Sequence, residues 1–177
     1  MSKKDNISNT DVDIILKPIT LLPTDIWAMM SIMAANDTEF SPRIAHDTIV
    51  PKTANVLQKM RSAAKLYNRV FNQTKTRGQN HKWYKIMSGD KIKGLIGVDY
   101  VRSMSVANVW FLGGDNVDYS IFEQAISLIQ GRFTNVAQLQ IKTDQTDEYS
   151  QNILQHLGWQ RSAFDHATTK AVYQKFR

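Results

Sequence analysis

Few side chains in this chain have the types and spacing that catalysis or metal binding needs. Its 177 residues include no cysteine, which excludes disulfides, thiolate metal sites and a cysteine nucleophile. The four histidines lack the spacing of a metal-binding pair such as His-x-x-x-His, so we predict no metal site. Each is more typical of a surface histidine than of a catalytic one: His46, His81, His156 and His166.

Positive charge is concentrated in one segment. The residues from Lys52 to Lys93 include eleven Lys or Arg and one acid, Asp90, whereas the whole chain carries a net charge of +6. Such an excess can attract nucleic acid, a nucleotide phosphate or an acidic protein. A solvated helix face followed by a basic loop would have the same composition, and it is the more common cause. We therefore keep RNA or DNA binding only as a weaker alternative.

The composition is that of a globular protein, with 42% hydrophobic and 21% charged residues. We expect one domain over 13–177 and a flexible tail at 1–12, which lacks the apolar middle of a signal peptide. No run of 18 apolar residues is present, so we expect no membrane span. The absence of cysteine is compatible with a reducing cytoplasm, which is the location that we expect.

Hydrophobic periodicity predicts a strand, two helices, three strands, a helix, a strand, a helix and two strands. The strands are expected at 13–19, 81–87, 92–101, 106–112, 137–142, 159–164 and 169–176, and the helices at 24–33, from 53 to about 71, 118–133 and 148–157. An antiparallel meander followed by a β-α-β crossover gives an α/β (α+β) fold. We predict a mixed, mostly antiparallel sheet of six to seven strands, with about four helices on its two faces.

The end of the last helix has the most specific pattern in the chain. Helical spacing runs through Leu157, and Gly158 and Trp159 follow at once. Glycine takes the left-handed conformation that ends a helix at no steric cost. We therefore expect Gly158 to end the helix and Trp159 to anchor the next strand in the core.

This helix end and the order of elements resemble the GNAT family of N-acetyltransferases over about residues 13 to 177. Many members have an Asn, a small residue three positions later, an apolar-Tyr pair and an apolar-Gly-Phe stop. The corresponding residues here are Asp147, Ser150, Ile153, Leu154, Leu157, Gly158 and Trp159. The small residue, the glycine and the aromatic residue match, and the acid nearly matches. A generic helix-Gly-strand junction would give part of the pattern, whereas the element order favours the family.

The resemblance implies an acyl-CoA N-acyltransferase-like fold with acetyl-CoA as co-substrate. In the family, the strand before the central helix splays from its neighbour, and its backbone pairs with the pantetheine arm of the cofactor. Here that strand is 106–112. The implied cofactor-binding groups are the backbone of Phe111, Leu112 and Gly113.

The resemblance also implies a pyrophosphate-binding loop that begins the central helix, where backbone N–H groups and the helix dipole favour anions. The implied residues are Asn116, Val117, Asp118, Tyr119 and Ser120. The loop is degenerate, because Gly113 and Gly114 come too early and no Arg or Gln leads it. Carboxylates at Asp115 and Asp118 would oppose a phosphate by roughly 3 kcal/mol at ~6 Å and an effective dielectric of ~20.

The catalytic acid and base are harder to assign. Many family members carry a proton-donating tyrosine where this chain has Leu154, so Tyr149 is the remaining candidate acid on that helix. Asp99, on the middle strand of the meander, is the candidate base, because a carboxylate with a raised pKa can accept a proton from an ammonium. A solvated aspartate on a strand would have the same sequence pattern.

The resemblance places the acceptor under the loop between the first two helices. Its candidates are Glu39, Phe40 and His46, since acids near an aromatic ring suit a cationic amine, although a polar surface loop would look alike. We expect an amine of a small molecule or a protein as partner. A homodimer is compatible with the sequence, and neither nucleic acid nor a membrane is expected.

Two functions follow. The first is an N-acetyltransferase that moves an acetyl group from acetyl-CoA to a primary amine. The alternative is a catalytically silent GNAT-fold protein with a binding or regulatory role, which the altered phosphate loop and Leu154 favour.

Overall fold

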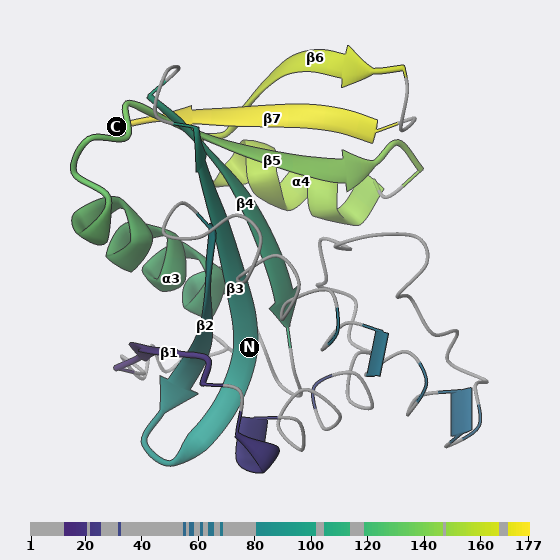
Figure 1. Cartoon of the computed structure of the whole chain (residues 1–177). Helices are drawn as coiled ribbons and strands as arrows, with labels where there is room; N and C mark the ends of the chain where they lie inside the picture. Colours follow the sequence, from purple (N-terminus) through teal and green to yellow (C-terminus); the bar gives the residue numbers. More distant parts are fainter. Residues whose placement is uncertain are drawn as a thin grey trace, which may run out of the picture.

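The computed structural model describes residues 13–20, 22–25, 81–101, 105–113, 119–146, 148–166 and 170–177, with isolated positions between 32 and 68. Its elements are β1 (Ile15–Pro18), β2 (His81–Ser88), β3 (Lys91–Val101), β4 (Val106–Gly113), α3 (Tyr119–Arg132), β5 (Gln138–Asp144), α4 (Glu148–His156), β6 (Gln160–Asp165) and β7 (Lys170–Phe176) (Figure 1). The expected order is confirmed over these residues. The two helices expected between 24 and 71 lie mostly outside them, although positions 24, 25, 32, 57, 58, 61, 64, 65 and 68 are helical.

The strands form one seven-stranded sheet in the order β1-β2-β3-β4-β5-β7-β6. Only β4 and β5 are parallel neighbours, because α3 carries the chain from the end of one to the start of the other. The other five neighbouring pairs are antiparallel. The predicted mixed, mostly antiparallel sheet is therefore confirmed.

The strand bounds follow from pairing within the sheet, as two strand ends show. Strand β5 was expected to end at Lys142, but Thr143 and Asp144 continue it because they pair with Ala171 and Lys170 of β7. The first strand was expected at 13–19 and runs from Ile15 to Pro18, its last residue. A proline is tolerated there because β1 is the edge strand of the sheet.

In the described part of the chain, one face of the sheet carries the hydrophobic core together with the helices α3 and α4. The buried residues of α3 recur at helical spacing and are Ile121, Phe122, Ala125, Ile126 and Ile129. Leu128 is 37% exposed, because it lies at the edge of this stripe. At the other end of α3, Arg132 donates a hydrogen bond to the Leu16 carbonyl (2.7 Å), which ties the helix to β1.

The helix end singled out in the sequence is a Schellman motif. Gly158 has φ of +80°. Its N–H donates to the Gln155 carbonyl at 3.0 Å, and the Trp159 N–H donates to the Leu154 carbonyl at 2.9 Å. Trp159 is buried and stacks on Phe122 with ring centroids 6.2 Å apart. The roles expected for the glycine and the tryptophan are both confirmed.

Candidate functional site

The sheet opens between its two parallel strands. Pairing of β4 with β5 runs from Val106 opposite Gln138 to Val109 opposite Ile141 and stops there. Both strands continue: β4 stays paired with β3 as far as Gly113, and β5 stays paired with β7 as far as Asp144. Figure 1 shows the two halves of the sheet diverging from this point. The backbone edges at 110–113 and 142–144 therefore face a split, and we call this region the β4–β5 split.

The first turn of α3 lies over the β4 side of the split. Phe122 contacts Phe111 edge to face, with ring centroids 4.9 Å apart. Tyr119, the first residue of α3, is 52% exposed and meets His156 at the end of α4, with centroids 6.5 Å apart. The first turn contains no acidic residue. The N-terminal end of a helix favours an anion through the helix dipole.

The structure places part of the predicted cofactor site at the split. Leu112 and Gly113 end β4 beyond the last pair with β5, as does Phe111, whose side chain is buried in the core. Tyr119 and Ser120 begin α3. The other predicted loop residues, Asn116, Val117 and Asp118, lie outside the described residues. Contact of any of these residues with a cofactor stays a prediction.

The opposite face of β2, β3 and β4 has an aromatic row beside the split. Trp83 pairs with Gly97, and Gly97 pairs with Trp110. All three lie on the face away from α3, because their neighbours Tyr84, Ile96 and Phe111 belong to the core. The two indoles are 6.3 Å apart between centroids with 20° between planes. Trp110 is the first residue of β4 beyond the last pair with β5, so this row borders the split.

A polar row lies beside the aromatic row on the same face. Asp99 pairs with His81 on one side and with Asn108 on the other, and Asn108 pairs with Gln140 of β5. Asp99, Asn108 and Gln140 are each half-buried. The predicted candidate base is therefore two residues along β3 from Gly97, next to the tryptophan pair. Its role as a base stays a prediction.

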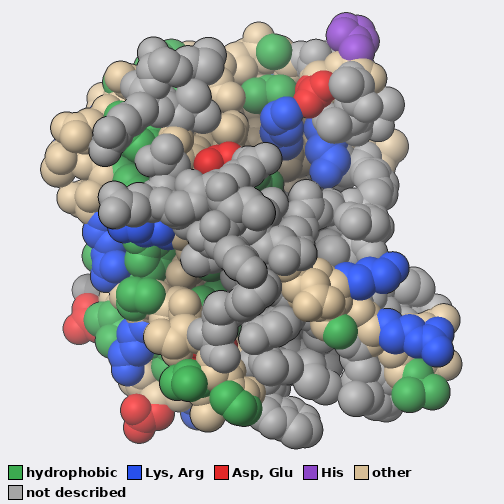
Figure 2. Space-filling model, in the orientation of Figure 1, with side chains coloured by type: hydrophobic (Ala, Val, Ile, Leu, Met, Phe, Trp, Pro, Cys, Tyr) green, Lys and Arg blue, Asp and Glu red, His purple; other side chains and the backbone are tan. Residues whose placement is uncertain are grey.

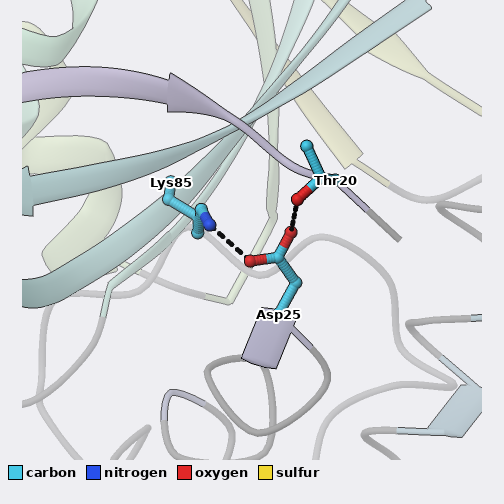
Figure 3. Close-up of polar contacts among 3 residues, drawn as sticks. All are labelled: Thr20, Asp25 and Lys85. Atoms are coloured by element: carbon cyan, nitrogen blue, oxygen red, sulfur yellow. Dashed lines mark hydrogen bonds and ion pairs between the residues drawn. The ribbon is translucent and has the colours of Figure 1, made fainter. Parts of the chain in front are cut away.

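The row on the other side of the tryptophans contains a buried ion pair. Lys85, which pairs with Leu95, donates to Asp25, and the Thr20 hydroxyl donates to the second carboxylate oxygen of Asp25 at 3.0 Å (Figure 3). The Asp25 side chain is 2% exposed and the Lys85 side chain 17%. The short helical segment at 23–25 is thereby fixed to the face opposite α3.

The remaining predicted residues have mixed outcomes. Leu154, which the resemblance places where many GNAT members have a tyrosine, is 1% exposed and part of the core. Tyr149 lies on α4, and its side chain is outside the description. The acceptor-loop candidates Glu39, Phe40 and His46 also lie outside the described residues.

Several negative findings apply to the described part of the chain only. It contains no group of three or more side chains suited to a metal ion. Among the same residues, no helix has the length and apolar character needed to cross a membrane. Figure 2 shows Lys and Arg side chains in several separate places on this face of the molecule. Arg61 and Lys65, two described residues of the basic segment, are exposed.

Sequence reasoning missed the two features that define the face opposite α3. The Lys85–Asp25 pair joins residues 60 positions apart, and no local pattern signals it. The tryptophan row depends on the register of three strands. The sequence did contain a signal for Gly97, because a glycine within a strand often marks a place where another group lies close to the backbone. Here that group is the Trp83 ring, which covers Gly97.

Comparison with known proteins identifies the fold. No family model matches the sequence, and no curated protein is similar enough in sequence to count as a match. Solved structures do match. Mycobacterium smegmatis RimJ in complex with CoA-disulfide has a TM-score of 0.67 and 10% identity, over 92% of this chain and 81% of that one.

Two further solved structures have a similar fold. The Salmonella typhimurium acetyltransferase that modifies the N-terminal serine of ribosomal protein L7/L12 has a TM-score of 0.65 and 12% identity, over 93% of this chain and 95% of that one. Campylobacter jejuni N-acetyltransferase PseH, in complex with acetyl coenzyme A, has a TM-score of 0.62 and 11% identity, over 93% and 99%. The chain therefore has the acyl-CoA N-acyltransferase-like fold of the GNAT acetyltransferases, as expected from its sequence.

Proposed function

We propose that this chain, with the fold of the GNAT acetyltransferases, moves an acetyl group from acetyl-CoA to a primary amine. The β4–β5 split is the observation that carries the proposal. Two parallel strands stop pairing with each other at Val109 and Ile141 while each keeps its other partner. The facing edges can then pair with an extended, amide-containing ligand, as a peptide pairs with a sheet edge. The pantetheine arm of coenzyme A is such a ligand.

The residues around the split fit the rest of the cofactor. Phe111, Leu112 and Gly113 would hold the pantetheine arm through their backbone, because they lie beyond the last β4–β5 pair. The backbone at Tyr119 and Ser120 would hold the pyrophosphate, since the first turn of α3 has no carboxylate of its own. When bound, acetyl-CoA supplies an acyl thioester whose carbonyl carbon can be attacked by an amine.

The protein's part in the reaction is to position the amine and to accept its proton. An amine attacks as the neutral base, so its ammonium form must first lose a proton. Asp99 is the proposed acceptor of that proton, directly or through water, because it lies on the row next to Trp110 at the edge of the split. Tyr149 is the proposed proton donor to the leaving thiolate. Holding both reactants together would supply most of the rate.

For the acceptor we propose a chemical class, a primary amine. The similar Salmonella enzyme modifies a protein N-terminus, which supports keeping a protein amine beside small-molecule amines. Glu39, Phe40 and His46 of the expected acceptor loop are proposed to contact it. We further propose a cytoplasmic location for the protein.

The burial of Leu154 favours a second candidate function. A core leucine at the position of the family's acid cannot donate a proton, so the chain could bind the cofactor without turnover and act as a binding or regulatory protein. Binding and catalysis must therefore be measured separately.

Thermal unfolding with acetyl-CoA and with CoA tests binding. A ligand at 100 times its dissociation constant adds about 2.7 kcal/mol to the free energy of unfolding. For a chain of this size that raises Tm by roughly 5–10 °C. Amide resonances at 110–113 and 142–144 should shift in the same titration. No stabilisation at millimolar cofactor would refute the proposal in its acetyl-CoA form.

Turnover is tested by release of free thiol from acetyl-CoA in the presence of a panel of primary amines and peptide N-termini. Thiol release that depends on the amine supports the enzyme. Tight cofactor binding without thiol release across the panel supports the silent alternative.

A further inference from the structure

We propose that Tyr173 and Gln151 are positioning residues, which hold the β5 side of the β4–β5 split in place for the pantetheine arm of the cofactor. The proposal rests on the acetyltransferase function above and adds two residues to it. It starts from two consecutive hydrogen bonds, which run from β7 through α4 to the turn after β5.

The first hydrogen bond begins on the last row where β4 and β5 are paired. Tyr173 pairs with Ile141, which is the last residue of β5 opposite β4. The Tyr173 side chain is fully buried in the core. Its hydroxyl donates to the side-chain oxygen (Oε1) of Gln151 on α4, at 3.1 Å. A buried hydroxyl without a partner is costly, so this bond orients the Gln151 amide.

The second hydrogen bond ends at the turn that follows the split. The side-chain nitrogen (Nε2) of Gln151 donates to the Gln145 carbonyl at 2.8 Å. A carbonyl can only accept, so this contact also determines that the amide oxygen faces Tyr173. Gln145 comes directly after Asp144, the last residue of β5. The three residues Tyr173, Gln151 and Gln145, which we call the α4 link, therefore connect the row where the split begins to the turn at its far end.

The end of β5 has a second side-chain tie, on the opposite face of the sheet. Beyond the last pair with β4, residues 142–144 keep only β7 as a strand partner. Lys142 contacts Asp165 of β6 at 2.6 Å, but the two side chains are 45% and 21% exposed. An exposed ion pair of this kind contributes little to stability. Of these two ties, the α4 link is therefore the one that we expect to hold the end of β5.

A fixed β5 edge favours a ligand that pairs with the edges of the split. An edge that moves in the free protein has to become ordered when the ligand binds, and this ordering weakens the affinity. The α4 link removes part of that cost before the cofactor arrives. It acts through the backbone of 142–144, so neither Tyr173 nor Gln151 has to touch the cofactor.

Tyr173→Phe tests the link, because it keeps the ring in the core and removes the hydroxyl. The loss of one neutral hydrogen bond corresponds to a change of about three- to tenfold. In the protein without cofactor, backbone amides at 143–146 should exchange with solvent faster by this factor, whereas those at 139–141 should be unchanged. The dissociation constant of CoA in calorimetry should rise by the same factor. In turnover, the KM for acetyl-CoA should rise and the KM for the amine should not.

A second variant separates positioning from stability. Tyr173→Phe combined with Gln151→Met removes both partners of the first hydrogen bond, so no amide oxygen is left without its donor and the free energy of unfolding should recover at least in part. The Gln145 carbonyl stays untied, so the affinity for CoA should remain low. Tyr84→Phe is the matched control, since it makes the same change in a buried tyrosine of β2. It should leave amide exchange at 143–146 and CoA affinity unchanged.

Three results would overturn the proposal. One is amide exchange at 143–146 that stays the same in Tyr173→Phe, or that rises equally at 139–141. Another is an unchanged CoA affinity in folded Tyr173→Phe. The third is a CoA affinity that recovers together with stability in the double variant. Failure of the unmodified protein to bind CoA would instead refute the proposed function, and amide exchange would still decide whether the α4 link holds the end of β5.

Discussion

Replacing Gly97 with alanine should destabilise the protein, although alanine is the better residue in most strands. The added Cβ would lie 2.8–2.9 Å from three atoms of the Trp83 ring. Carbon atoms in contact are normally about 3.5–4.0 Å apart, so the ring must move by most of an ångström. Trp83 is only 4% exposed, and the contacted atoms belong to the rigid ring rather than to a flexible end. Relief of this strain therefore requires a movement of the packed ring, which costs free energy.

The expected magnitude follows from two opposing effects. Overpacking of this kind costs about 1–3 kcal/mol. The loss of unfolded-state freedom on replacing glycine returns about 0.4–1 kcal/mol. We therefore expect Gly97→Ala to lower the free energy of unfolding by about 1–2 kcal/mol and Tm by roughly 2–8 °C.

Gly131→Ala is the matched control. It makes the same chemical change in the last turn of α3, where no atom lies within 4 Å of the added Cβ. This variant should be unchanged or stabilised by up to about 1 kcal/mol. Urea unfolding followed by circular dichroism measures both. The Gly97→Ala cost should also shrink in a Trp83→Leu background, because the clash is gone. Equal stability of the two alanine variants, or no coupling with Trp83→Leu, would refute the reasoning.

Three other predictions concern single contacts. Asp25→Asn should cost about 2–4 kcal/mol in urea unfolding because it leaves half-buried Lys85 without its counter-ion, whereas Asp25→Leu with Lys85→Met should cost clearly less than the two single changes together. Gly158→Ala should lower the free energy of unfolding by about 1–2 kcal/mol, because alanine is strained at φ of +80°, and Gly158→Asn should lower it less. Equal urea midpoints for the two variants and the unmodified protein would argue against a left-handed residue at the end of α4. Asp118→Gly, at the expected phosphate loop, should tighten CoA binding by up to about 100-fold in calorimetry, and an unchanged dissociation constant would show that this carboxylate does not compete.

The sequence predicted best those features that short stretches of chain determine. The Schellman motif at Gly158 uses hydrogen bonds between residues at most five positions apart, so its signal is local. The β2–β3 turn is similar, with Gly89 at φ of +57°. The element order was predictable for the same reason, because each strand or helix shows its own periodicity.

Features that depend on pairing across the sheet could not be predicted in the same way. The extension of β5 to Asp144 is caused by partners on β7, which follow 26 and 28 residues later in the chain. The tryptophan row needs the registers of both the β2–β3 and the β3–β4 pairs. The sequence therefore predicted the strand and the helix start that form the site, but it did not predict which side chains lie together around them.

The alternation of side chains along β4 separates the two proposed binding events. Phe111 points into the core under α3, Trp110 points to the opposite face, and the backbone of both lies at the split. A cofactor paired with the edge would depend on the backbone, whereas an amine that approaches from the face opposite the core would contact the side chain of Trp110. Substitutions at Trp110 that keep β4 intact should then change the KM for the amine with little change in the KM for acetyl-CoA. A parallel rise in both constants would mean that one stretch of strand cannot serve the two ligands independently.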